Sequence, residues 1–154
     1  MKKYKQKIIP EINSKWKNKK GKELRRLMFE EFRKISKRNT IIINESLKIP
    51  IILSNSTGGR KVSFGGSVYN KKAETVRIIN KLLKYAEYNN FGEAKLTDKK
   101  YVIGYLNFKA KFKLDNKTEN VRIAVQMRKD GKFYYNHEIN IVFNSKKDVS
   151  QRGH

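Results

Sequence analysis

Two stretches in the C-terminal half of the chain alternate between apolar and polar residues, which is typical of β-strands with one buried face and one face in water. They are residues 101–114 and 121–128, and a third apolar stretch follows at residues 133–143. The connections between them contain Asp, Asn and Gly, which favour tight hairpin turns. We therefore predict an antiparallel sheet. Its apolar face carries Val102, Leu106, Phe108, Ala110, Phe112, Leu114, Val121, Ile123, Val125 and Met127, and its polar face carries Tyr105, Asn107, Lys109, Lys111, Lys113, Arg122, Gln126 and Arg128.

The last hairpin allows two registers. A two-residue turn places His137 on the polar face, whereas a three-residue loop with Gly131 in the left-handed conformation pairs Met127 with Phe133 and places His137 opposite Ile123. The hydrophobic pattern favours the second register. It puts Phe133, Tyr135, Ile139 and Ile141 on the apolar face and Tyr134, Asn136 and Glu138 on the polar face.

Apolar residues at three- and four-residue spacing predict two amphipathic helices, at residues 22–37 and 70–87. In the second, Asn70 is expected to cap the start and Glu74 to interact with the helix dipole. Its wide apolar stripe is expected to cover the apolar face of the sheet. The predicted fold class is therefore α+β, an antiparallel β-sheet covered on one face by an α-helix, with an N-terminal helical extension.

The remaining segments are predicted to be short strands, loops and an arm. Residues 40–43 and 49–53 are expected to form short strands, with Pro50 at a sheet edge or a strand start. Residues 54–66 form a Gly-rich loop that is either a plain turn or a phosphate-contacting loop. Residues 88–100 are expected to be a loop. The first 21 residues are Lys-rich and interrupted by Pro10, so we expect a partly ordered basic arm, with phosphate tracking as the alternative.

The charge of the chain is high and is not confined to one end. The 154 residues carry 37 Lys and Arg against 14 Asp and Glu, a net charge of +23. We divide the chain into a basic helical N-terminal extension (1–39), an α+β domain (40–144) and a flexible tail (145–154). Both of the first two segments are basic. A compact domain needs far less charge for solubility, so we expect a polyanionic partner, with nucleic acid ahead of an anionic membrane surface.

The composition also excludes several kinds of chemistry. The chain has no Cys, which excludes thiolate metal sites, disulfides and Cys nucleophiles. It has two His residues, which argues against a His-rich metal site, and we expect no metal and no cofactor. No apolar run is long enough to span a bilayer, and the N-terminus lacks the apolar core of a signal peptide. The expected location is therefore the cytosol of a host or target cell, either as a protein made there or as a fragment delivered by a larger carrier.

The order of these segments resembles the BECR nuclease superfamily, which joins barnase, EndoU, the tRNase colicins and RelE. The segments that carry the resemblance are residues 52–63, Lys71-Lys72, and residues 104–108, 121–127 and 134–138. The last of these reads Tyr-Tyr-Asn-His-Glu. The pattern covers residues 49–143 and is similar to the phage and mobile-element versions found at the ends of large polyvalent proteins.

The resemblance implies a toxin-like endoribonuclease that needs no metal and cleaves RNA by attack of the 2′-hydroxyl on the adjacent phosphate. It gives His137 the role of general acid or base, and it gives phosphate stabilisation to Arg60, Lys61 or Lys72. EndoU-like members use two histidines, and this chain has one inside the domain. Some toxins of the superfamily work with Lys and Arg alone. The implied partners are RNA, with tRNA as one candidate, and a cognate immunity protein.

Two alternatives stay open on the residues themselves. Glu138 is a rival general base, and a lone His in a strand is more often a packed residue than a catalyst. The second function is a non-catalytic nucleic-acid-binding protein or an inhibitor that acts on a host nuclease complex. In either case we expect the polar face of the sheet to hold nucleic acid. The expected contacts are Lys72, Tyr105, Lys109, Lys111, Lys113, Arg122, Arg128 and Tyr134.

Overall fold

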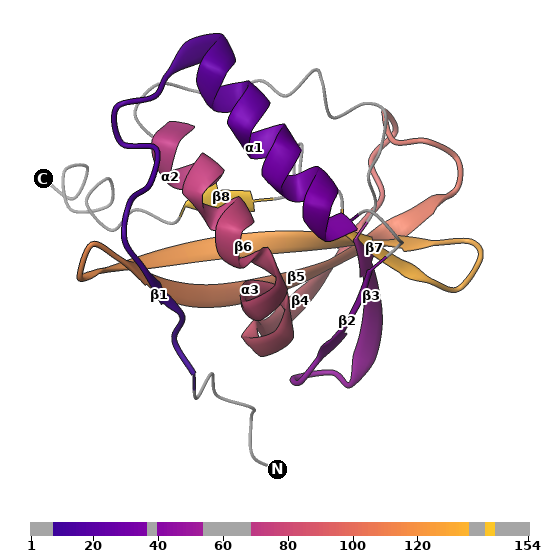
Figure 1. The fold of residues 1–154 in the computed structure, drawn as a ribbon. Coiled ribbons are helices and arrows are strands. Elements are labelled where there is room, and N and C mark those ends of the chain that lie inside the picture. Colours follow the sequence, from indigo (N-terminus) through magenta and orange to yellow (C-terminus); the bar gives the residue numbers. More distant parts are fainter. Residues whose placement is uncertain (1–7, 37–39, 54–68, 136–140, 144–154) are drawn as a thin grey trace, which may run out of the picture.

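The computed structural model of the chain describes residues 8–36, 40–53, 69–135 and 141–143. Within these ranges the helices gather on one side of strands β5 and β6 (Figure 1), and the predicted α+β class is confirmed. The elements in chain order are β1 (Glu11–Ile12), α1 (Gly21–Ser36), β2 (Ile41–Asn44), β3 (Ile49–Leu53), α2 (Tyr69–Thr75), the 3-10 turn η3 (Val76–Ile78), α3 (Ile79–Tyr85), β4 (Glu87–Glu93), β5 (Val102–Leu114), β6 (Lys117–Arg128), β7 (Phe133–Tyr135) and β8 (Ile141–Phe143).

The described strands form one sheet around the long β5–β6 hairpin. The strand order is β1-β5-β6-β7-β3-β2, with β4 also paired to β5 and β8 also paired to β6. Most pairings are antiparallel, as predicted. Two are parallel, between β1 and β5 and between β3 and β7. Parallel neighbours need a long connection, and the chain between β3 and β7 contains α2, α3 and strands β4 to β6.

The hairpin after β6 has the register that the hydrophobic pattern favoured. Met127 pairs with Phe133, and Gly131 has a positive φ of 81°. The continuation is different, because Ile141 of β8 occupies the position opposite Ile123 where His137 was expected. The pattern predicted one continuous strand, and an alternation of apolar residues does not reveal how many residues separate two strands on the same partner. His137 itself lies outside the described residues.

Both predicted helices pack their apolar residues into one core with the sheet. In α1 the buried apolar residues are Leu24, Met28 and Phe32. The second helix is less regular than predicted, since it divides into α2, η3 and α3 and ends at Tyr85. Its predicted stripe is buried, and the buried residues of α2, η3 and α3 include Ala73, Val76, Ile78, Ile79, Leu82 and Leu83, with Ala86 just beyond.

Two local predictions in this region are wrong. Asn70 does not cap the helix but lies inside α2, where its amide donates hydrogen bonds to the carbonyls of Trp16 and Lys19, each at 3.0 Å. The predicted loop at residues 88–100 begins as a strand, because β4 pairs with β5 from Glu87 to Glu93. Its sequence is polar and rich in Asn, so pairing with a neighbour rather than local propensity forms this strand.

The N-terminal segment is docked from residue 10 onward, which corrects the expectation of a partly ordered arm there. β1 adds to the edge of β5, and Trp16 is only 4% exposed. The hydrophobic core includes Trp16 and the buried face of α1 together with sheet residues. Side chains from both sides of the predicted boundary at residue 39 therefore share one core, and the division into domains stays a prediction.

Candidate nucleic-acid interface

The sheet has one face that the described helices do not cover, here called the open face. It is formed by the alternate side chains of β5 and by their partners on β6, which are exposed or half-buried. The register pairs Tyr105 with Gln126, Asn107 with Ala124, Lys109 with Arg122, Lys111 with Asn120 and Lys113 with Thr118. Because directly paired residues project from the same side of a sheet, the polar face predicted from the sequence is a single surface.

One end of the open face is positively charged, and we call Lys109, Lys111, Lys113 and Arg122 the cationic end. Lys109 lies directly opposite Arg122, and like charges in this position repel. Among the described residues, no ion pair involves Lys109, Lys113 or Arg122. Glu87 is the other neighbour of Lys109, on β4, and forms no ion pair with it in this part of the chain. An anion bound here relieves the repulsion.

The other end of the open face is aromatic, and we call Tyr101, Tyr105, Arg128 and Tyr134 the aromatic end. The Arg128 guanidinium carbon lies 3.9 Å from the centre of the Tyr134 ring and 4.8 Å from that of Tyr101. Both are cation–π distances. Arg128 Nε also donates to Gln126 Oε1 at 3.0 Å. Three elements, the start of β5, the end of β6 and β7, bring these side chains together.

Two carboxylates hold the tyrosine hydroxyls of the aromatic end. Tyr105 donates to Asp98 at 2.7 Å, and Tyr134 donates to Asp130 at 2.6 Å. Burial, followed by the bond to Asp98, raises the pKa of Tyr105 to about 12. The bond to Asp130 is the main cause of the raised pKa of Tyr134. Both tyrosines are therefore neutral donors at neutral pH.

The same contacts lower the pKa values of the two carboxyl groups. Asp98 accepts hydrogen bonds from the Lys95 backbone N–H and from Tyr105, in that order of effect. Asp130 accepts from Tyr134 and then from the Lys132 backbone N–H. Hydrogen bonds to the charged form of a carboxyl group favour that form. Two negative charges therefore lie at the aromatic end.

The structure brings together most of the predicted binding residues but places Lys72 elsewhere. Lys72 belongs to α2, on the helical side of the sheet, and burial lowers the pKa of its ammonium group. Its neighbour Lys71 forms an ion pair with Glu119 at 3.1 Å, also on the side away from the open face. Lys72 is therefore on the other side of the sheet from the cationic end.

The four predicted catalytic residues, Arg60, Lys61, His137 and Glu138, lie outside the described residues. The described chain ends that lead to them are neighbours. β3 and β7 are adjacent parallel strands in which Leu53 pairs with Tyr135. Residues 54–66 follow the first of these strands, and residues 136–138 follow the second. Both candidate segments therefore begin at the C-terminal ends of two adjacent strands.

Tyr101 of the aromatic end was not among the predicted site residues, and neither were the two carboxylates beside it, Asp98 and Asp130. Tyr101 stands four positions before Tyr105, which puts both on one face of an alternating strand. That spacing was a usable signal. The carboxylates gave none, because Asp in a polar loop is an ordinary turn residue until the structure shows which hydroxyl it accepts.

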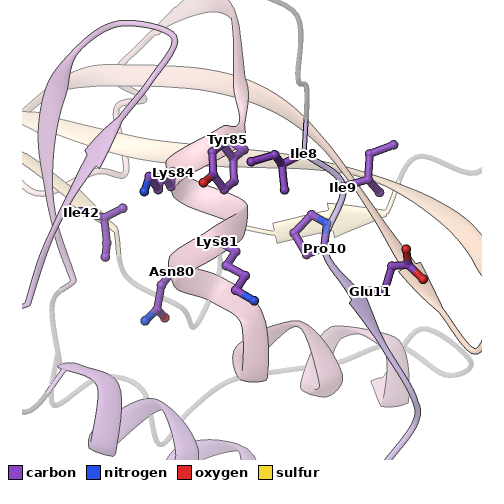
Figure 2. A pocket seen from close by; sticks show the side chains of 9 residues that line it. All are labelled: Ile8, Ile9, Pro10, Glu11, Ile42, Asn80, Lys81, Lys84 and Tyr85. Atoms are coloured by element: carbon purple, nitrogen blue, oxygen red, sulfur yellow. The ribbon is translucent and has the colours of Figure 1, made fainter.

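A cavity of about 560 Å³ lies apart from the open face. Figure 2 shows the side chains of the N-terminal segment, of α3 and of Ile42 around it. Ile8, Ile9, Pro10 and Ile42 contribute apolar walls, and Glu11, Lys81 and Lys84 contribute charge. It contains none of the predicted binding residues. Among the described residues, no three His, Asp or Glu side chains gather as a metal site.

The fold and the open face define a basic α+β domain with a sheet face that its described helices leave uncovered. The family comparison agrees with part of the sequence-based hypothesis. Residues 19–135 match the family described as large polyvalent protein-associated domain 3, and the chain belongs to that family. The predicted likeness to the large-polyvalent-protein-associated type is confirmed, whereas membership of the BECR superfamily stays a hypothesis.

Two other comparisons found no relative. No curated protein and no solved structure matches the chain significantly. None of the helices in the described part of the chain is both long and apolar enough to cross a membrane.

Proposed function

We propose that this domain binds single-stranded RNA along the open face of its sheet. The observation that carries the proposal is the cationic end, where Lys109 and Arg122 face each other and neither forms an ion pair with another described residue. A polyanion that lies across them neutralises both charges and releases its own counterions. The net charge of +23 adds a long-range attraction for the same ligand.

The aromatic end favours a single strand over a duplex. Tyr101 is 47% exposed, so part of its ring is accessible. Unpaired bases commonly stack on exposed aromatic side chains, whereas the bases of a duplex are stacked on one another and present only their edges. A sheet face with rings at one end and cations at the other therefore suits a strand whose bases are free.

The proposal extends to cleavage of the bound RNA. Its support is the resemblance to metal-independent ribonucleases, together with the pairing of Leu53 with Tyr135. Leu53 and Tyr135 are the last residues of two adjacent parallel strands. The segments that contain Arg60 and His137 therefore begin side by side at the same end of these strands. The proposed reaction is attack of the 2′-hydroxyl on the adjacent phosphate, with His137 or Glu138 moving the proton and Arg60 or Lys61 stabilising the negative charge.

The test is incubation of purified protein with total RNA in the presence of EDTA, alongside a binding assay at low salt. We expect the parent protein to bind and to cleave. His137→Ala is expected to bind RNA as the parent does and to cleave about 10²–10⁴ times more slowly, because a general acid–base group acts mainly on the rate. Arg60→Ala is expected to lose part of both.

The outcomes separate the two functions. Absence of binding at low salt contradicts the proposal as a whole. Binding without cleavage by the parent protein supports the non-catalytic alternative, an RNA-binding protein or an inhibitor of a host nuclease complex. Cleavage by His137→Ala at the parental rate leaves Glu138 with Arg60 and Lys61 as the catalytic set.

A further inference from the structure

We propose that Tyr101, Arg128 and Tyr134 form a stacking site for one unpaired nucleobase, separate from the phosphate contacts of the cationic end. The inference rests on the proposed RNA-binding function and assigns different parts of the ligand to the two ends of the open face. The cationic end accepts phosphates, and the aromatic end accepts a base.

Arg128 is already held by contacts within the open face. Its guanidinium is in cation–π contact with two rings, at 3.9 Å from the centre of Tyr134 and 4.8 Å from the centre of Tyr101. Gln126 fixes it further by accepting a hydrogen bond from Nε at 3.0 Å. A planar cation held against aromatic rings is a surface on which a base can stack, and little side-chain entropy is lost on binding because the group is already ordered.

Hydrogen bonds to two carboxylates also hold the tyrosines of the aromatic end in place. Tyr134 donates its hydroxyl proton to Asp130 at 2.6 Å, and Asp130 accepts a second hydrogen bond from the Lys132 backbone N–H at 2.8 Å. Tyr105, next to the stack, is tied in the same way to Asp98 at 2.7 Å. These contacts fix the ring of Tyr134 and leave Tyr101, 47% exposed, as the most accessible ring of the set.

Two carboxylates distinguish the aromatic end from the cationic end. Asp98 and Asp130 both accept hydrogen bonds that favour their ionised forms, and cations lie near each of them, Lys95 near Asp98 and both Lys132 and Arg128 near Asp130. The two negative charges offset part of the attraction of these cations for phosphate, whereas they do not repel a neutral base. The four side chains of the cationic end are all positively charged. The cationic end is therefore better suited to the phosphates, and the aromatic end to a base.

The next strands extend the aromatic end with apolar residues rather than with further charge. Ile52 pairs with Tyr134 across the β3–β7 boundary, and Ile41 pairs with Ile52 and is 56% exposed.

The two ends of the open face are close enough for one ligand to reach both. Arg122 of the cationic end is four residues along β6 from Gln126, which contacts Arg128 of the aromatic end, and four residues of a strand span about 13 Å. One short single strand can therefore contact both ends.

The test uses short 2′-O-methyl oligonucleotides, which the proposed reaction cannot cleave because the nucleophilic hydroxyl is blocked. One oligonucleotide carries the fluorescent base 2-aminopurine, and its partner has the same phosphates but abasic residues in place of bases. We expect the parent protein to quench 2-aminopurine fluorescence on binding and to bind the abasic strand about tenfold more weakly, which is the usual scale of one stacked base.

Two variants of one residue isolate the ring. Tyr101→Ala is expected to bind the base-containing strand about tenfold more weakly and to bind the abasic strand as the parent does. Tyr101→Phe keeps the ring and is expected to match the parent on both. Because Tyr101 is half-exposed, we expect both variants to keep the parental melting temperature.

The results distinguish this inference from the function on which it rests. Equal, salt-dependent binding of both strands by the parent overturns the stacking site and leaves RNA binding intact. Equal weakening of both strands by Tyr101→Ala also overturns it, because the loss then does not involve a base. Absence of binding of either strand at low salt contradicts the proposed function itself.

Discussion

The carboxylate of Glu74 accepts a hydrogen bond from the backbone N–H of Trp16 at 2.8 Å, although 58 positions separate the two residues. The same carboxylate accepts from the Lys15 N–H at 2.9 Å and pairs with Arg77 at 2.7 Å. Glu74 is 1% exposed, so it has exchanged water for these partners. The N-terminal segment is thereby fixed to the helices that cover the sheet.

Loss of Glu74 is expected to destabilise the whole domain. Glu74→Leu leaves two backbone N–H groups without their acceptor and removes the ion pair of Arg77, and we expect the free energy of unfolding to fall by about 3 kcal/mol or more. Urea unfolding followed by the fluorescence of Trp16 measures it. The control is Glu30→Leu, which removes an exposed ion pair with Arg26 and is expected to cost less than about 1 kcal/mol. Equal midpoints for both variants contradict the role of Glu74.

A charge in the helix–sheet core is expected to prevent folding or nearly so. Ile79 is fully buried at the start of α3, and Ile79→Asp places a carboxylate there without a partner. We expect a loss of several kcal/mol in stability. Asn80→Asp makes a similar chemical change one residue away on an exposed position and serves as the control. Melting temperatures measured by circular dichroism compare the two, and a parental value for Ile79→Asp contradicts the observed packing.

Charge reversal at the cationic end is expected to reduce the salt dependence of RNA binding. For single strands, the slope of log affinity against log salt is about −0.7 for each phosphate contact. The triple change Lys109→Glu, Lys111→Glu and Lys113→Glu is expected to weaken binding and to flatten that slope. Fluorescence anisotropy at several salt concentrations measures both quantities.

The control for this experiment changes the net charge equally at another site. Lys17, Lys20 and Lys22 are exposed, with Lys22 in the first turn of α1 and the other two in the segment before it. Their replacement by Glu is expected to lower affinity through the overall charge and to leave the slope nearer to the parental value. If the parent and the triple variant of Lys109, Lys111 and Lys113 have identical slopes, the open face is not the binding site.

Acid is expected to weaken the contact between Ser14, just after β1, and the β5–β6 turn. Asp115 accepts hydrogen bonds from the hydroxyl and the backbone N–H of Ser14, and both lower the pKa of Asp115 from its ordinary value of 3.8. A carboxyl group whose pKa is lower in the folded state stabilises the fold above its unfolded pKa, and this contribution disappears as the pH falls through the folded pKa.

The variant Asp115→Asn tests this contribution. Asn tolerates the left-handed conformation of this position, where φ is 51°, so the turn is kept while the charge is lost. We expect the parent to have the higher melting temperature at neutral pH and the difference to shrink on the acid side of 3.8. A difference that does not change with pH shows that the charge of Asp115 is not involved.

The sequence alone determined the elements whose partners are close along the chain. Three- and four-residue spacing located α1 and the helical segment that follows β3, and period-two spacing located β5, β6 and their two faces. It also favoured the register of Met127 with Phe133, because only that register keeps Phe133 and Tyr135 with the apolar residues. In each case one buried face fixes a local periodicity, and the periodicity is visible without knowledge of the fold.

The tertiary structure alone decided which distant segments meet. The pairing of Leu53 with Tyr135, the strand from Glu87 to Glu93 and the burial of Glu74 have no local signal. The same holds for the contact of Arg128 with Tyr101, on which the stacking site depends. These contacts arise because the core brings together segments tens of residues apart. Their free energy comes from partners that no short stretch of sequence contains.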